Sequence, residues 1–331
     1  MRNGFGQPPP PRPVVRLGKL ARSALAPGSH GRVLASTSSA IYLMSGGRAL
    51  LWLANERATL HRRGVQVVGP LPQVEPDATY AVSGRRLDLG QRLAFDLSSA
   101  SVWDVAPVCH ERITSLAPLS VRLVTAFPLL ARLPSPSGFG RLLPAILGRI
   151  DSSLGPRSIA APSPSLSRAW PAIRDVLDAC QAARLPAALH CAEELVGLGE
   201  GLTPSGDDFV GGLLYSFRRL RDIDASQGRL ERRELDLFLS RSRRRTNLIS
   251  YTLLRDHAGG HASAALHQFV DALLFGGPRH RMGALAMQLT AVGHSTGWDL
   301  LTGVVVGMMS TCRLHAPSVP GEATAARLLQ P

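Results

Sequence analysis

Two short segments in the C-terminal half combine glycines, hydroxyl groups and carboxylates directly before an apolar run. Residues 199–208 read GEGLTPSGDD, and residues 293–299 read GHSTGWD. Glycines let a ligand approach the main chain closely. Helix N-termini expose unpaired N–H groups and a partial positive charge, which favour small anions. We therefore predict that both segments begin helices and lie next to each other around a shared small-anion site.

Helix capping is the structural alternative for these segments. Ser205-x-x-Asp208 and Thr296-x-x-Asp299 both have the spacing of a capping box. Capping accounts for neither Glu200 nor the glycines, so we favour a functional interpretation. The candidate catalytic residues are Glu200, Asp208 and His294. The candidate substrate contacts are Gly199, Gly201, Thr203, Ser205, Gly206, Asp207, Ser295, Thr296 and Asp299.

A third segment, residues 241–250, reads RSRRRTNLIS and adds Arg245, Thr246 and Ser250 as candidate contacts. Thr246 and Ser250 share one face of a helix because they are four residues apart. A guanidinium suits carboxylate and phosphate oxygens. A solvated basic turn is the alternative, and for the other arginines it is the preferred one. His257 and His261 have a metal-binding spacing but no evident third ligand, so no metal ligand is predicted.

The elements that must position these residues divide the chain in two. Residues 30–133 contain short strand-like runs at 33–44, 49–53 and 65–68, with the hairpin signal Ser45-Gly46-Gly47-Arg48 between the first two. This predicts a β-rich domain, either a small barrel or a sandwich. Residues 1–29, rich in Pro and Arg, are expected to form a disordered or extended lead-in.

Helical spacing dominates the second half. Residues 134–167 have the Pro/Ser composition of a linker, with a short helix expected over 141–150. Residues 168–315 predict five to seven helices packed as a bundle, with amphipathic faces such as that of Ile173, Val176, Leu177 and Cys180. Residues 316–331 are expected to form a tail. The predicted fold class is α+β.

Composition narrows the function classes. The net charge is +13, but Lys19 is the only lysine and the arginines are scattered. No zinc-finger spacing or aromatic RNA-binding strand accompanies them, so nucleic acid is not an expected partner. The four cysteines are far apart, as in a reduced compartment. No run reaches the roughly 18 apolar residues of a membrane span. Since no secretory apolar region is found either, the cytoplasm is the expected location.

The three segments together resemble, in this order, the AllH-type family, which is associated with oxamate carbamoyltransferase at the end of anaerobic allantoin breakdown. The resemblance is sharp over about residues 190–310 and diffuse over 30–170. Asn247 stands where a second hydroxyl group is expected.

The resemblance implies a multi-subunit enzyme that moves a carbamoyl group between phosphate and oxamate. This chain would be one component beside AllF-like and AllG-like subunits. The helix N-termini and Arg245 would neutralise the small anionic substrates, carbamoyl phosphate and oxamate. Glu200 or His294 would serve as a base, and Asp207 and Asp208 would orient donors or hold Mg²⁺ through water. Two alternatives stay open, a non-catalytic scaffold subunit and a stand-alone metal-dependent phosphoryl-transfer or hydrolytic enzyme.

Overall fold

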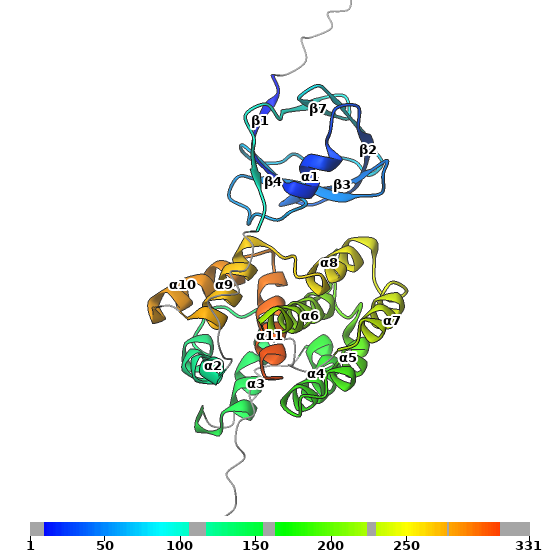
Figure 1. The fold of residues 1–331 in the computed structure, drawn as a ribbon. Coiled ribbons are helices and arrows are strands. Elements are labelled where there is room, and N and C mark those ends of the chain that lie inside the picture. The colour runs from blue at the N-terminus through cyan, green and yellow to red at the C-terminus, as the bar shows by residue number, and fades with distance from the viewer. Residues whose placement is uncertain (1–9, 106–116, 155–162, 224–229, 277, 312–331) are drawn as a thin grey trace, which may run out of the picture.

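The computed structural model describes residues 10–105, 117–154, 163–223, 230–276 and 278–311. Its N-terminal part is a β-barrel and its C-terminal part is helical, which confirms the predicted α+β class (Figure 1). The strands are β1 (Arg12–Gly18), β2 (His30–Ser36), β3 (Ala40–Ser45), β4 (Leu50–Asn55), β5 (Gly64–Val67), β6 (Thr79–Ser83), β7 (Arg86–Leu89), β8 (Leu93–Asp96) and β9 (Ser101–Trp103).

The barrel closes through β1. Sheet order runs β5-β4-β3-β2-β6-β7-β8-β1-β9, and β1 also pairs with β5, so eight strands form a closed ring. Alternation explains which side chains face inward: in β3, Ile41 and Leu43 are fully buried in the barrel core while Tyr42 between them is partly exposed. The predicted turn joins β3 to β4, with the Arg48 N–H donating to the Ser45 carbonyl at 2.8 Å. Of the two predicted possibilities, the barrel is therefore the correct one.

The lead-in expected over residues 1–29 differs from the structure from Arg12 onward. Residues Arg12–Gly18 form β1, and Lys19–Ala24 form helix α1 across one opening of the barrel (Figure 1). The reason is burial, because Val14, Leu17 and Ala21 are part of the barrel core. Residues 1–9 lie outside the described part of the chain.

The helical part begins earlier than expected. Helix α2 (Ala117–Leu130) occupies a segment assigned to the β-rich domain from the sequence. Its Leu119, Leu123, Phe127 and Leu130 recur at helical spacing and are buried in the same core as the C-terminal helices. The boundary expected at residue 133 is therefore wrong, since the barrel strands end at Trp103.

The supposed linker also belongs to the helical core. The short helix expected over 141–150 is present as α3 (Leu143–Ile150), preceded by the 3₁₀ turn η2 (Gly138–Leu142), and another such turn, η3 (Ser152–Leu154), follows. Phe139 and Leu142 are buried, so this segment packs inside the domain rather than bridging two domains. Its apolar residues outweigh the Pro/Ser composition that suggested a linker.

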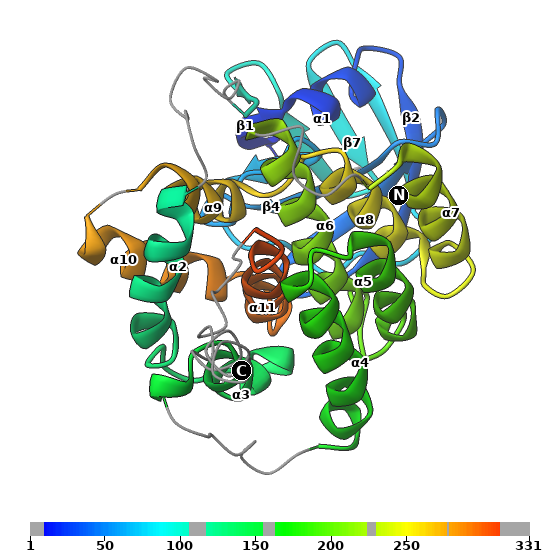
Figure 2. The same cartoon turned by 60° about the horizontal axis from the view of Figure 1, so that its bottom comes forward.

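Eight further α-helices follow in the described residues, against the five to seven expected: α4 (Pro164–Gln181), α5 (Leu185–Ala192), α6 (Ser205–Ile223), α7 (Arg232–Ser242), α8 (Leu248–Ala258), α9 (Ala264–Phe275), α10 (Arg279–Thr290) and α11 (Thr296–Met308), with the turn η4 (Glu193–Leu195) after α5. The predicted face of Ile173, Val176, Leu177 and Cys180 is buried on α4. Helices α6 and α11 lie at the centre, and the others surround them (Figure 2). The tail expected at 316–331 lies outside the described residues. None of the described helices is long and apolar enough to cross a membrane.

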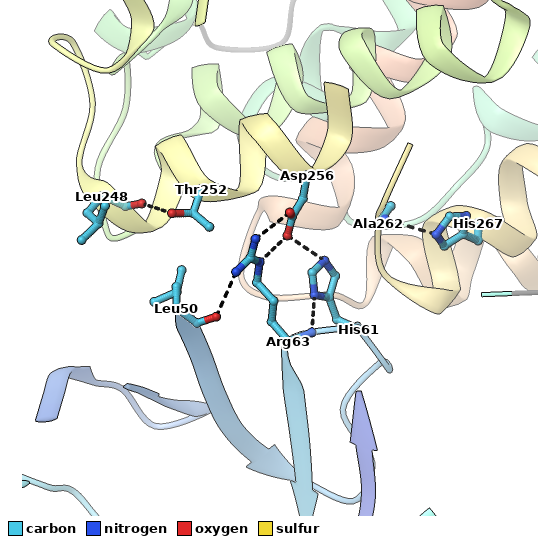
Figure 3. A network of polar contacts seen from close by, with 8 residues as sticks. All are labelled: Leu50, His61, Arg63, Leu248, Thr252, Asp256, Ala262 and His267. Atoms are coloured by element: carbon cyan, nitrogen blue, oxygen red, sulfur yellow. Dashed lines mark hydrogen bonds and ion pairs between the residues drawn. The ribbon is translucent and has the colours of Figure 1, made fainter. Parts of the chain in front are cut away.

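The barrel and the helices are joined by a buried polar contact. Arg63 directly precedes β5, and its guanidinium donates two hydrogen bonds to the carboxylate of Asp256 near the end of α8, one of them 2.8 Å long (Figure 3). His61 Nε2 lies 3.9 Å from the same carboxylate, and burial lowers the pKa of His61 to about 3, so its ring is neutral. The backbone N–H of Ala264 also donates to the Leu60 carbonyl at 2.7 Å. The two parts are therefore docked through specific groups.

Candidate functional site

Two glycines bring α6 and α11 into close contact. A Cβ on Gly212 would lie 2.2 Å from the Leu300 carbonyl oxygen, and one on Gly303 would lie 2.0 Å from the Phe209 carbonyl oxygen. No larger residue fits at either position without moving backbone. Each glycine follows an aspartate of its own helix by four residues, Asp208 in α6 and Asp299 in α11. The crossing therefore fixes the two helix starts beside one another.

The two predicted segments meet through their hydroxyl groups. Thr203 Oγ1 lies 3.1 Å from Thr296 Oγ1, and Ser205 Oγ lies 3.4 Å from Ser295 Oγ. The expectation that residues 199–208 and 293–299 are neighbours is thereby confirmed. Each hydroxyl pair has two hydrogens and uses one in its mutual bond, so one remains for a carboxylate or a ligand.

The structure does not show the capping boxes expected at Ser205–Asp208 and Thr296–Asp299. Ser205 and Thr296 are the first residues of their helices rather than the residues before them. In α11 the N-cap position is held by Ser295, whose side chain makes no capping hydrogen bond. The aspartates of the proposed boxes are directed toward the contact between the two helices, where burial and mutual repulsion decide their properties.

Asp208 and Asp299 form a buried pair of carboxyl groups. They are 3% and 0% exposed, respectively. Burial raises the pKa of Asp299 to about 7, against which the Phe139 N–H and the Ser205 and Ser295 hydroxyls act. Burial, and then the charge of Asp299, raise the pKa of Asp208 well above its ordinary value. Oδ2 of each carboxyl accepts no hydrogen bond from the described residues. A pair that repels in this way holds a proton near neutral pH.

The segment Ser137–Phe139, which is not among the candidates from the sequence, contacts Asp299 and the loop before α11. The Phe139 N–H donates to Asp299 Oδ1 at 2.6 Å, and Ser137 Oγ donates to the His294 carbonyl oxygen at 2.9 Å. Gly138 lies between them with a φ of +51°, and a Cβ there would stand 2.3 Å from Asp299 Oδ1. The sequence PSPSGFG around these residues has the composition of a loop, and no short-range spacing connects it to Asp299.

Asp207 has a different role from its neighbour. Its Oδ1 accepts from the Gly197 N–H at 2.8 Å, and its Oδ2 accepts from the hydroxyl of Thr246. Burial raises the pKa of Asp207, and these two donors together with Ser250 oppose that rise. Asp207 and Thr246 thus connect the glycine-rich loop to the start of α8.

Residues 241–250, the third segment predicted from the sequence, contribute to the site through the start of α8. Asn247 caps α8 by accepting hydrogen bonds from the N–H groups of Ile249 and Ser250, at 2.9 and 3.0 Å. Its Nδ2 donates to the Leu202 carbonyl at 2.8 Å, and Ser250 Oγ donates to the same oxygen at 3.3 Å. An amide can cap the helix and donate at once, which explains Asn247 where a hydroxyl was expected. Ser250 likewise holds the loop in place.

The remaining candidates, apart from the buried Gly206, lie at the surface. Glu200, Arg245 and His294 are exposed, and their side chains make no hydrogen bond to a described residue. Gly199 and Gly201 have φ values of +123° and +88°, in the region that favours glycine. Gly206 lies inside the first turn of α6, where a Cβ would stand 1.9 Å from the Leu195 carbonyl oxygen. The structure therefore separates an exposed loop rim from the buried pair beneath it.

The barrel is electrostatically coupled to this site. Burial, together with the charge of Asp208, raises the pKa of the Tyr42 hydroxyl to about 12. The Tyr42 ring packs against Trp52 with centroids 6.0 Å apart, and Trp52 packs on His61 at 4.8 Å. Tyr42 was not a candidate from the sequence, because nothing in its strand distinguishes it from an ordinary outward-facing residue.

The donor set is made only of oxygen atoms. Carboxylates and hydroxyls suit hard cations such as Mg²⁺ better than soft metals. Within the described ranges, no group of three or more His, Cys, Asp or Glu side chains is arranged to hold a metal ion.

Comparison with known proteins gives one family. Residues 195–308 match the family model described as "Oxamate carbamoyltransferase subunit AllH". The match covers about a third of the chain. It contains the segments 199–208, 241–250 and 293–299 in full, whereas the Ser137–Phe139 segment lies outside it. The resemblance inferred from those segments is thereby confirmed. No solved structure matches this chain.

Proposed function

From the match of residues 195–308 to the AllH family, we propose that this chain is the AllH-type subunit of an oxamate carbamoyltransferase and that it contributes the Asp208–Asp299 pair to the reaction. The enzyme would move a carbamoyl group between phosphate and oxamate, as part of allantoin breakdown in the cytoplasm. AllF-like and AllG-like subunits would complete the assembly. The observation that carries the proposal is the buried carboxyl pair at the start of two touching helices.

The chemistry needs a group that gives and takes a proton. In the direction that forms carbamoyl phosphate, a phosphate oxygen attacks the carbamoyl carbon of N-carbamoyl oxamate. The C–N bond then breaks, and the departing nitrogen must gain a proton to leave as the amide of oxamate. A carboxyl group with a pKa of about 7, as for Asp299, can supply that proton near neutral pH and recover it in the reverse reaction.

The hydroxyl groups provide the second requirement. Negative charge develops on the carbamoyl oxygen during transfer, and preorganised donors stabilise it. Thr203, Thr296, Ser205 and Ser295 surround the pair and each hydroxyl pair has a hydrogen to donate. We assign the exposed Arg245 and His294 to capture of the anionic substrates at the rim, in place of the proton-transfer role expected for His294, and the exposed carboxylate of Glu200, which would repel these anions, is given no such role.

The test is co-expression of this chain with the AllF-like and AllG-like subunits, followed by a phosphate-dependent assay for oxamate release. D299N and D208N should each lower kcat by about 10²-fold or more, which is the usual contribution of a general acid or base. D178N removes an exposed carboxylate that pairs with Arg149, and it should leave the rate unchanged. R245M and H294N should raise KM more than they lower kcat, because each removes a donor to the anionic substrate.

Two other outcomes would redirect the proposal. An intact complex in which D208N and D299N retain the wild-type rate would make the chain a scaffold subunit. Activity of the chain alone that requires added Mg²⁺ would favour the stand-alone metal-dependent enzyme.

A further inference from the structure

An apolar groove runs between α2 and α10 at one edge of the helical domain, where Figures 1 and 2 both place these helices. Its volume is about 380 Å³. The lining residues are Pro128, Leu129, Arg132, Leu133, Pro134, Gly283 and Met287. Leu129 packs against the bare backbone of Gly283, and this leaves the side chain of Met287, one turn further along α10, 51% exposed.

The groove continues as an exposed apolar stripe along α2. Val121 and Val124 are 66% and 37% exposed, and with Pro128 they have the i, i+3, i+7 spacing of one helix face. The opposite face of α2, with Leu123 and Phe127, is already buried in the core. Val121, Val124 and Met287 are therefore apolar side chains beside the groove that an apolar partner surface could bury.

Both walls of the groove lead to the candidate site. The chain leaves α2 through Leu133 and Pro134 and reaches Phe139, whose N–H holds Asp299. It leaves α10 at Thr290 and enters the 293–295 loop that precedes α11. Ser137 Oγ bonds the His294 carbonyl oxygen and so ties these two exits together. A partner seated in the groove would therefore lie against the two helices whose C-terminal ends continue into the segments that flank Asp299.

Charge indicates the chemistry of that partner. The sequences of α2 and α10 contain no acidic residue. Arg132 and Arg281 are exposed and form no ion pair with any acidic side chain in the described parts of the chain. An apolar groove with a cationic rim is complementary to a helix that has one apolar face and acidic flanks.

We propose that this groove is the docking site for an amphipathic, acid-flanked helix of a partner subunit, which would pack against α2 and α10. The proposal rests on the proposed function, because it is the family's description as a subunit that supplies a partner chain.

The experiment compares matched charge insertions in the co-expressed complex. M287E and V124E place a carboxylate in the groove and on the stripe, and each should weaken assembly about tenfold or more, measured by size-exclusion chromatography with light scattering over a dilution series. L237E is the control, because Leu237 on α7 is similarly exposed, at 48%, outside the groove. Unchanged circular dichroism and melting temperature would show that the variants are folded.

The outcomes separate the two proposals. Complexes that assemble equally well with M287E, V124E and wild type would overturn the groove assignment while leaving the subunit function standing. Failure of the wild-type chain to bind either partner would overturn both. A wild-type chain that dimerises alone, and loses its dimer in M287E, would assign the groove to a second copy and overturn the partner helix. Weaker assembly of R132E would support the cationic rim.

Discussion

The backbone N–H of Phe139 donates a 2.6 Å hydrogen bond to Oδ1 of Asp299, a residue 160 positions further along the chain. This single contact joins the η2 segment to the first turn of α11 and supports a carboxyl group that is otherwise short of partners. The buried pair therefore depends on three segments, of which two have helix-start sequences and the third does not.

Asp299 makes a specific pH dependence of stability testable. Burial raises its pKa in the folded protein to about 7, above its ordinary value of 3.8. Between these two values the folded state retains a proton on Asp299 that the unfolded state has lost. The free energy of unfolding of the wild type therefore falls as pH rises from about 4 to about 7. The side chain of D299N cannot ionise and lacks this decline. The free energy of unfolding of D299N minus that of wild type should therefore increase over this range, by at most about 1.4 kcal/mol per pH unit. Urea unfolding at several pH values measures this.

D178N controls for the removal of one negative charge from the surface. A constant difference between D299N and wild type from pH 4 to pH 8 would mean that Asp299 is ionised throughout.

Gly138 should be intolerant of any side chain. Alanine there must adopt a φ of +51° and place its Cβ against the Asp299 carboxylate. G84A is a matched control, because Gly84 has a φ of +59° with nothing within 4 Å of the added Cβ. G84A should cost about 1–2 kcal/mol from backbone strain alone. G138A should cost more in a denaturant titration, and an equal loss in the two variants would show that the contact with Asp299 is easily relieved.

Thr246 should prove structural. T246V removes the hydroxyl that donates to Asp207 and leaves a buried carboxylate oxygen without that donor, at a cost of about 1–3 kcal/mol. Thr252 is half-buried and donates only to the Leu248 carbonyl of its own helix, so T252V should cost less than T246V, about 1 kcal/mol or less. If thermal unfolding shows no difference between the two variants, Asp207 does not need Thr246.

The contact between Arg63 and Asp256 should decide whether the barrel and helices unfold together. R63M leaves Asp256 buried without its cation, which typically costs about 3–5 kcal/mol. R149M removes one partner of the exposed pair with Asp178 and should cost about 1 kcal/mol or less. We expect R63M to unfold in two steps when tryptophan fluorescence and far-UV circular dichroism are compared. A single transition at the wild-type midpoint would show that apolar packing alone joins the two parts.

Local patterns in the sequence determined the fold class and the site segments 199–208, 241–250 and 293–299, but not the fourth segment, Ser137–Phe139. Short apolar runs and turn residues predicted the barrel strands over 33–44, 49–53 and 65–68, and helical periodicity predicted the buried face of α4, because both signals arise between residues a few positions apart. The glycine-hydroxyl-carboxylate strings marked 199–208 and 293–299 for the same reason. The burial of β1, α2 and η2 was not predicted, since Pro-rich or Pro/Ser composition dominated their local signal.

Only the tertiary structure decided what the two aspartates are. From sequence, Asp208 and Asp299 are equally well explained as helix caps, because each follows a hydroxyl residue by three positions, which is the spacing of a capping box. The crossing of α6 and α11 at Gly212 and Gly303 brings the carboxyl groups together, out of reach of water. Their raised pKa values are therefore a property of two helices far apart in the chain. Desolvation and repulsion depend on distance in space, which local spacing does not encode.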